Sequence, residues 1–456
     1  MTMTDASANA STNTSTTPRL RRVLGQGGAA ALSIGVMAPT LAMSVVGPEP
    51  ARIVGRAAPL AFAVAGLLVF VVSAGFVRLS NHFASAGSVY AFVGGAIGPR
   101  AGAFTGWTML GTYLVFPWVS VAGFTIFGAD LARLGGFDVD WYPLALAGWL
   151  VLGFLGASGL RSAVRALIAF ELGAVLVILA LMGVVVGAAH HPLTAEVFLP
   201  PAHVPAGALV TAATAAFLAY CGFEAAGSLG EEARSPLRTV PRAMLWTVGL
   251  GLVFYTVCVA VQVWGFGSDP AGVAVFAGTS APLSVLAGTY VGPWLAGVLD
   301  VAALVSAVGA GLGCVIVAVR MLFALGREGV LPPLLARVSP RTGAPTTALA
   351  VEMAVGLLTI TGFRLAGATP GQMFFVLATI GVLHLLVMYA ITNVAAVRFT
   401  GSGGRRWTQF ASVVGVVVAA AVLVQNLLSA PVALLVTITL WLALGVVVGG
   451  RAGRRL

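Results

Sequence analysis

The sequence predicts an all-α integral membrane protein with 12 transmembrane helices. The first observation is composition: of the 456 residues, 59% are hydrophobic and only 8% are charged. The second is a mean hydropathy of +1.02. A water-soluble chain of this length needs far more surface charge, so lipid must be the solvent for most of this surface. Third, the apolar stretches are continuous rather than alternating, which favours helices over a β-barrel.

The apolar segments each have about the length that a membrane-spanning helix needs. They occupy residues 28–46, 57–77, 101–129, 142–158, 160–187, 208–230, 242–266, 292–322, 346–363, 371–397, 409–427 and 430–449. The break at Ser158 and Gly159, followed by Arg161 and Arg165, indicates a turn at the membrane surface between the fourth and fifth segments. Residues 1–27, rich in Ser, Thr, Ala and Asn, are predicted to be a disordered cytoplasmic tail, and residues 450–456 a second tail.

The arginines predict the orientation of the chain. All 24 basic residues are arginine, and the chain has no lysine. If the N-terminus is cytoplasmic, only Arg52, Arg56, Arg133 and Arg364 fall on the outer side. Such an excess of basic residues in the inner loops is typical of inner-membrane proteins. The sequence therefore predicts a multi-pass protein of the cell (inner) membrane with both termini cytoplasmic, and the net charge of +10 needs no nucleic-acid partner.

Two of the predicted spans are interrupted. The first contains Pro39 in its middle, and proline removes a backbone donor and clashes with the preceding turn. The sixth contains Gly222 beside Glu224. Irregular backbone at membrane depth is tolerated only where it is buried in protein or lines a water-filled cavity. Interrupted helices at corresponding places in two halves indicate the binding site of a secondary transporter, and these two spans are five apart.

The polar residues give little support to an enzyme. His190, His191 and His203 share a predicted outer loop with Glu196, but their spacing is not that of a metal site. Cys221, Cys258 and Cys314 lie singly in apolar segments, as small buried side chains do. No cofactor and no metal are predicted. A channel would need a continuous polar stripe, which these spans lack.

Several motifs, in order along the chain, resemble those of the amino acid–polyamine–organocation (APC) superfamily of permeases. The most specific is FLAYCGFEAAGSLGEEARSPLRTVPRA at residues 217–243. SAGSVY at residues 85–90, Gly106-Trp107 with Tyr113, and RMLFALGREGVLP at residues 320–332 are similar to the family as well.

The resemblance implies a LeuT-type fold, a 5+5 inverted repeat plus two peripheral helices, over residues 28–187, 208–397 and 409–449. It implies a secondary active transporter that moves amino acids by alternating access around a site between spans 1, 3, 6 and 8, either coupled to protons or by exchange. A transporter of polyamines or other organic amines is the alternative, and a non-transporting sensor on the same scaffold is a minor one. The bilayer and a small substrate are the expected partners, for a monomer or a homodimer.

The two breaks are the expected substrate cradle, because interrupted helices leave N–H groups and partial positive charge at membrane depth. Its candidate residues are Gly35, Met37, Ala38, Pro39, Thr40, Phe217, Tyr220, Cys221, Gly222 and Glu224, with Tyr113 added by the resemblance. Ordinary kinks used for packing are the alternative. Glu224 is either a counter-ion for a substrate ammonium or a charge that satisfies the end of the interrupted helix. Two features depart from the family: Pro39 offers no N–H to a substrate carboxylate, and the lysine that some proton-coupled members carry in span five is absent.

Three further titratable residues lie within predicted spans. Glu171, about 16 Å into span five, is a proton-coupling candidate or a structural carboxyl. His384 in span ten is a second such candidate, or is bonded to a backbone carbonyl. Asp300 could line an outer vestibule or serve as a capping carboxylate. Ser306 is the one hydroxyl that span eight offers at the sodium position of the family, which disfavours sodium coupling.

Overall fold

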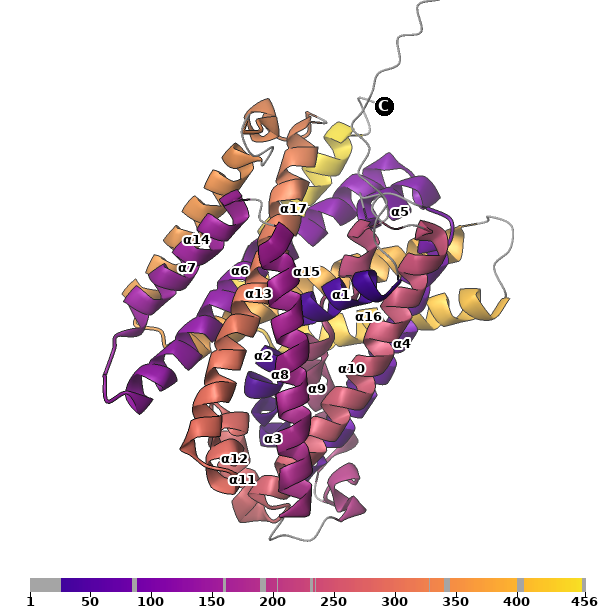
Figure 1. Ribbon diagram of the computed structural model, residues 1–456. Helices are drawn as coiled ribbons and strands as arrows, with labels where there is room; N and C mark the ends of the chain where they lie inside the picture. Colours follow the sequence, from indigo (N-terminus) through magenta and orange to yellow (C-terminus); the bar gives the residue numbers. More distant parts are fainter. Residues whose placement is uncertain are drawn as a thin grey trace, which may run out of the picture.

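The computed structural model describes residues 26–83, 88–158, 161–188, 194–202, 204–229, 233, 235–327, 329–339, 345–399 and 406–452. Within these ranges the chain is helical and has no β-strand (Figure 1). Most of the two predicted tails, residues 1–25 and 453–456, lies outside the described residues, as do His190, His191 and His203. Residues 26–27 and 450–452, which the sequence assigns to these tails, are helical instead.

Seventeen α-helices and five short 3₁₀ helices follow one another in the described chain. They are α1 (Gln26–Met37), α2 (Pro39–Val45), α3 (Pro48–Val54), η1 (Gly55–Ala57), α4 (Ala58–Ser80), α5 (Ser88–Ile97), α6 (Pro99–Leu134), α7 (Trp141–Ser158), α8 (Arg161–Gly187), η2 (Ala195–Phe198), α9 (Ala206–Ala216), η3 (Phe217–Tyr220), η4 (Phe223–Leu229), α10 (Pro236–Phe266), α11 (Pro270–Gly278), α12 (Pro282–Tyr290), α13 (Pro293–Arg327), η5 (Pro333–Ala336), α14 (Thr346–Leu365), α15 (Pro370–Arg398), α16 (Arg406–Ser429) and α17 (Val432–Ala452).

Eleven helical stretches among the described residues are long and apolar enough to cross a membrane. They correspond to the second through twelfth predicted spans. The first predicted span, residues 28–46, forms the shorter pair α1 and α2, and the sixth is divided into α9, η3 and η4. The multi-pass, all-helical architecture is thus confirmed. The count of 12 spans and the inverted repeat remain predictions.

Short helices also occupy connections that the sequence left unassigned. Helix α5 lies between the second and third predicted spans and packs on α6, while α11 and α12 lie between α10 and α13. Each of α11 and α12 begins with proline, at Pro270 and Pro282, where the missing N–H costs no helical hydrogen bond. The side chain of Asp269 also caps α11 by accepting from the Gly272 N–H at 2.7 Å.

The long helix α6 packs against both α13 and α15, and α4 packs against α10. The broken segments lie inside this arrangement, because α1 contacts α8, α10, α13 and η4 (Figure 1). Helices α7 and α14 lie side by side at one edge. Outward-facing Leu and Val side chains, such as Leu176 (67% exposed) and Leu358 (73%), match the lipid surroundings that the composition predicts.

A tryptophan pair attaches the last helix to the core. The rings of Trp107 in α6 and Trp441 in α17 are stacked, with centroids 4.4 Å apart. Each indole N–H donates to the backbone carbonyl of the other residue, at 2.8 Å from Trp107 and 3.1 Å from Trp441. Both indole donors are therefore satisfied without water, as lipid surroundings require.

Candidate functional site

The first break separates α1 from α2 at Ala38, which adopts a left-handed conformation with φ 47° and ψ 63°. Pro39 then begins α2 with a preset φ and no N–H. The next two N–H groups are held by side chains from other helices: Thr40 donates to Glu171 Oε1 at 2.9 Å, and Leu41 donates to Ser306 Oγ at 3.2 Å. The N-terminal turn of α2 is therefore anchored to α8 and α13 rather than open to solvent.

The second break lies between η3 and η4. Cys221 is extended, with φ −66° and ψ 135°, and Gly222 has φ 110°, a conformation that favours glycine. The Gly222 N–H donates to Glu224 Oε2 at 3.2 Å. A Cβ on Gly222 would lie 3.2 Å from the backbone nitrogen of Met37, so the two breaks approach each other backbone to backbone.

Glu224 is completely buried and is the acceptor of a polar network. The Tyr113 hydroxyl on α6 donates to Oε1 at 3.0 Å, and the Tyr389 hydroxyl on α15 donates to Oε2 at 2.8 Å. Together with the Gly222 N–H, three donors face one carboxylate. The Ser33 hydroxyl on α1 also donates to the Phe223 carbonyl at 3.3 Å, which fixes η4 against span one. At each break, a protein carboxylate thus accepts from a backbone N–H that the interruption leaves without a helical partner: Glu171 at the first break and Glu224 at the second.

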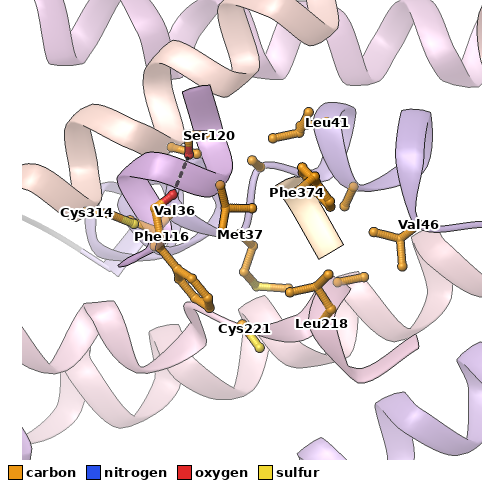
Figure 2. Close-up of a pocket in the computed structure, with 15 residues that line it drawn as sticks. Val36, Met37, Leu41, Val46, Phe116, Ser120, Leu218, Cys221, Cys314 and Phe374 are labelled. Carbon is orange, nitrogen blue, oxygen red and sulfur yellow. Dashed lines mark hydrogen bonds between the residues drawn. The ribbon is translucent and has the colours of Figure 1, made fainter. Parts of the chain in front are cut away.

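A cavity of about 70 Å³ lies beside the two breaks. Figure 2 shows side chains that converge on it from span one, from Leu218 and Cys221 before the second break, and from the neighbouring helices. Its lining consists of Val36, Met37, Ala38, Leu41, Ala42, Val46, Phe116, Val119, Ser120, Leu218, Ala219, Cys221, Ala310, Cys314 and Phe374. The Ser120 hydroxyl is engaged by the Phe116 carbonyl at 3.1 Å. The wall is therefore apolar, with no charged side chain.

The predicted cradle residues divide into two groups. Met37, Ala38 and Cys221 line the cavity. The remaining candidates do not line it: Gly35, Pro39, Thr40, Tyr113, Phe217, Tyr220, Gly222 and Glu224. The Tyr220 hydroxyl, for example, donates to the Phe62 carbonyl on α4 at 2.8 Å. The structure brings the two breaks together, and most of their polar groups do not line the cavity.

The other three candidates lie at separate places. Glu171, 4% exposed, is the partner of Thr40 described above. His384 lies on α15 with Nδ1 2.8 Å from the Ile380 carbonyl, and its ring meets Trp441 edge to face. Asp300 on α13 accepts from the Ser284 hydroxyl on α12. Neither His384 nor Asp300 lines the cavity.

Sequence reasoning missed much of the cavity wall. Phe116, Val119 and Ser120 come from α6, Ala310 and Cys314 from α13, and Phe374 from α15. These residues carry no signal of their own, because an apolar side chain in an apolar span is equally suited to packing and to lipid contact. Glu352 in α14 was also missed, although a carboxylate within the apolar segment 346–363 is as visible as Glu171.

Cys221 offers a direct test of the cavity's position. In a variant whose only cysteine is Cys221, with Cys258 and Cys314 changed to alanine, we expect slow reaction with a small maleimide and protection by bound substrate. Slow reaction follows because the residue is only 5% exposed and its thiol is engaged by the Phe217 carbonyl at 3.6 Å. The matched control retains Cys258 alone, which is fully buried and does not line the cavity. Labelling of Cys221 at equal rates with and without substrate would contradict the assignment.

Comparison with known proteins identifies the relatives of the chain. The profile of the amino acid permease family matches residues 24–449. The branched-chain amino acid permease BcaP of Lactococcus lactis is 25% identical over 383 residues, which cover 78% of this chain and 80% of that protein. A transporter of Mycobacterium tuberculosis is 28% identical over 431 residues, 91% of this chain and 89% of its own length. The cationic amino acid transporter 3 of Arabidopsis thaliana is 24% identical over 371 residues, covering 74% and 57%.

Proposed function

The chain belongs to the amino acid permease family, and from this premise we propose that it is a secondary active transporter that moves amino acids across the cell membrane by alternating access. Transporters of this kind place their substrate near the bilayer midplane, between interrupted helices. The observation that carries the proposal is the cavity beside the breaks at Ala38 and Gly222. Both termini are cytoplasmic in this proposal, and the protein works as a monomer or a homodimer.

The cavity wall favours a substrate with an apolar side chain. Leu41, Val119, Leu218 and Phe374 are typical of its lining, and no acid, arginine or histidine contributes to it. A branched-chain amino acid fits this chemistry, and BcaP of Lactococcus lactis is named for such substrates. A polyamine would need anionic partners at the site. The nearest candidates for such partners are Glu224 and Asp300, but Glu224 accepts from two tyrosines and Asp300 from Ser284.

The size of the cavity supports alternating access. About 70 Å³ is much less than the roughly 300–1,000 Å³ of a typical ligand pocket. The site must therefore expand to admit an amino acid. All seven residues of α2 are buried, whereas Ile34, Gly35 and Val36 of α1 are half-buried. We propose that opening occurs on the α1 side, where these three residues are less deeply buried than those of α2.

The substrate carboxylate competes with a carboxylate of the protein. Thr40 and Leu41 hold the N–H groups nearest to the first break, and Glu171 and Ser306 already accept from them. We propose that the substrate carboxylate takes over part of this role, and that the displacement of Glu171 signals occupancy to α8. Accumulation is coupled to protons or proceeds by exchange, and Glu171 and His384 remain candidates for the proton.

Transport of labelled leucine into proteoliposomes tests the proposal, and matched ligands test the substrate class. We expect leucine to enter the vesicles and to raise the melting temperature of the purified protein, because a ligand that binds only the folded state stabilises it. The decarboxylated analogue 3-methylbutylamine has the same side chain without the carboxylate. We expect it to bind at least tenfold more weakly, equivalent to about 1.4 kcal/mol. Stabilisation by the amine alone, without leucine flux, would contradict the amino-acid proposal and favour an amine transporter.

A further inference from the structure

A carboxylic acid that neither break uses lies within α14. Glu352 is fully buried, at 0% exposed. It lies on the face of α14 that also carries Ala348, Gly356 and Ile360, spaced four residues apart and buried as well. This face packs against α6, α7, α13 and η5. The other buried residues on this face are small or apolar, and Glu352 is the one acid among them.

No group in the described part of the chain neutralises Glu352. Neither carboxylate oxygen has a hydrogen-bond partner, and no ion pair involves the residue. The Trp118 indole N–H is the donor that faces it, but this N–H too lacks a hydrogen bond of regular geometry. An ionised carboxylate in such surroundings costs several kcal/mol. A protonated one costs far less, because it carries no charge.

The titratable groups that face Glu352 from the neighbouring helices supply no positive charge to it. Cys314 on α13 interacts electrostatically with Glu352, and a thiol offers no positive charge. Tyr113 on α6 donates to Glu224, and Tyr142 on α7 is 3.0 Å from the Thr361 hydroxyl, more than two turns away along α14. The 3₁₀ helix η5 contributes only proline, leucine and alanine. Glu171 differs from Glu352 in having a hydrogen-bond donor, the Thr40 N–H at 2.9 Å.

Two neighbours of Glu352, Trp118 and Cys314, connect it to the cavity. Trp118 directly precedes Val119 and Ser120, which line the cavity, and Cys314 is part of the wall itself. The indole also contacts α14 one turn further on, since a Cβ on Gly356 would lie 2.6 Å from Trp118 Nε1. A change of charge at Glu352 therefore acts on a side chain whose neighbours in sequence form the substrate site.

We propose that Glu352 is a proton-binding site of this transporter, protonated in the arrangement described here, and that loss of its proton moves Trp118 and the α6 wall of the cavity. An ionised Glu352 attracts the indole N–H, whereas the protonated acid leaves the present packing undisturbed. Proton binding thereby biases the cavity toward one of two shapes. This inference rests on the proposed function, since it names the group that couples the proton to amino-acid movement.

The first test compares two transport modes in proteoliposomes with labelled leucine. Glu352→Gln has the size of the protonated acid and cannot ionise. We expect exchange of internal for external leucine to stay within twofold of wild type, and accumulation driven by a pH gradient to fall at least tenfold. Full gradient-driven accumulation by this variant would overturn the inference. A wild type that transports no leucine would instead overturn the proposed function.

A second measurement does not depend on transport. Infrared spectroscopy detects the C=O stretch of a protonated carboxylic acid, and we expect Glu352→Gln to remove one such band from the spectrum at neutral pH. The matched control is Glu196→Gln, because Glu196 is exposed and paired with Arg56 at 2.7 Å, and its change should remove none. An unchanged acid band in Glu352→Gln would show that Glu352 is ionised, and the inference would be wrong.

If Glu352→Gln does not fold, Trp118→Phe provides the test. It removes the N–H that faces the acid while keeping an aromatic ring. We expect exchange to persist and the pH of half-maximal gradient-driven uptake to move upward, because the ionised acid loses its one donor. An unchanged pH profile in this variant would contradict a link through Trp118.

Discussion

Replacing Gly222 by alanine is expected to reduce amino-acid transport at least tenfold. The residue has φ 110°, and holding a side chain in such a sparsely populated region costs about 1–3 kcal/mol. The new Cβ would also lie 2.9 Å from Val36 Cγ1, 3.2 Å from the Met37 nitrogen and 3.3 Å from the Val36 carbonyl carbon. The Val36 side chain can rotate, but the backbone atoms can withdraw only if the two breaks separate.

Two other glycines provide matched controls for this substitution. Gly173 and Gly183 lie on α8, and a Cβ at either position would meet no atom within 4 Å. Alanine there should leave transport unchanged, because it fills open space and favours the helix by about 0.5–1 kcal/mol. Initial rates of leucine uptake and melting temperatures in detergent measure both effects. Wild-type transport by Gly222→Ala would mean that the close approach of the breaks is not needed for function.

The second large effect is expected at Glu224. Glu224→Leu removes the only acceptor that the structure gives to the Tyr113 hydroxyl, the Tyr389 hydroxyl and the Gly222 N–H. Each buried donor left without a partner costs about 1–3 kcal/mol. We therefore expect little folded protein, and a melting temperature far below that of wild type for what remains.

Graded variants separate the contributions to this network. Glu224→Gln keeps an acceptor oxygen and should be less harmful than leucine. Tyr113→Phe and Tyr389→Phe each remove one donor and should lower stability by a smaller amount. Their effects should not be additive, because both hydroxyls serve one carboxylate. The control is Tyr142→Phe, whose hydroxyl meets Thr361 in a half-buried place remote from the breaks. Equal melting temperatures for Glu224→Leu and Tyr142→Phe would refute the structural importance of the network.

The positions of the two breaks could be predicted from the sequence. Pro39 has a definite physical effect on a helix, and Gly222 beside a carboxylate in an apolar span is unusual enough to mark a second interruption. The structure places the first break one residue before Pro39 and the second at Gly222. The long helices could be predicted equally well, because a continuous apolar segment of this length has few structures open to it in a membrane other than a spanning helix.

The hydrogen-bond partners of the residues at the breaks could not be predicted from the sequence. That Glu171 accepts from Thr40, and Glu224 from Tyr113 and Tyr389, depends on contacts between residues separated by more than 100 positions. The rotation of each helix about its own axis decides such contacts. Apolar periodicity is too weak to fix this rotation when lipid and protein interior are both apolar. The same ambiguity concealed the contributions of α6, α13 and α15 to the cavity.

The reciprocal tryptophan pair has a consequence for biogenesis. Trp107 and Trp441 are 334 residues apart, so the first indole enters the membrane long before the second is synthesised. Until then, Trp107 has neither its stacking partner nor its hydrogen-bond acceptor. Helix α17 therefore packs onto an α6 that was synthesised long before it. A chain truncated before Trp441 would display an unpaired indole donor within the bilayer, where no water is present to accept from it.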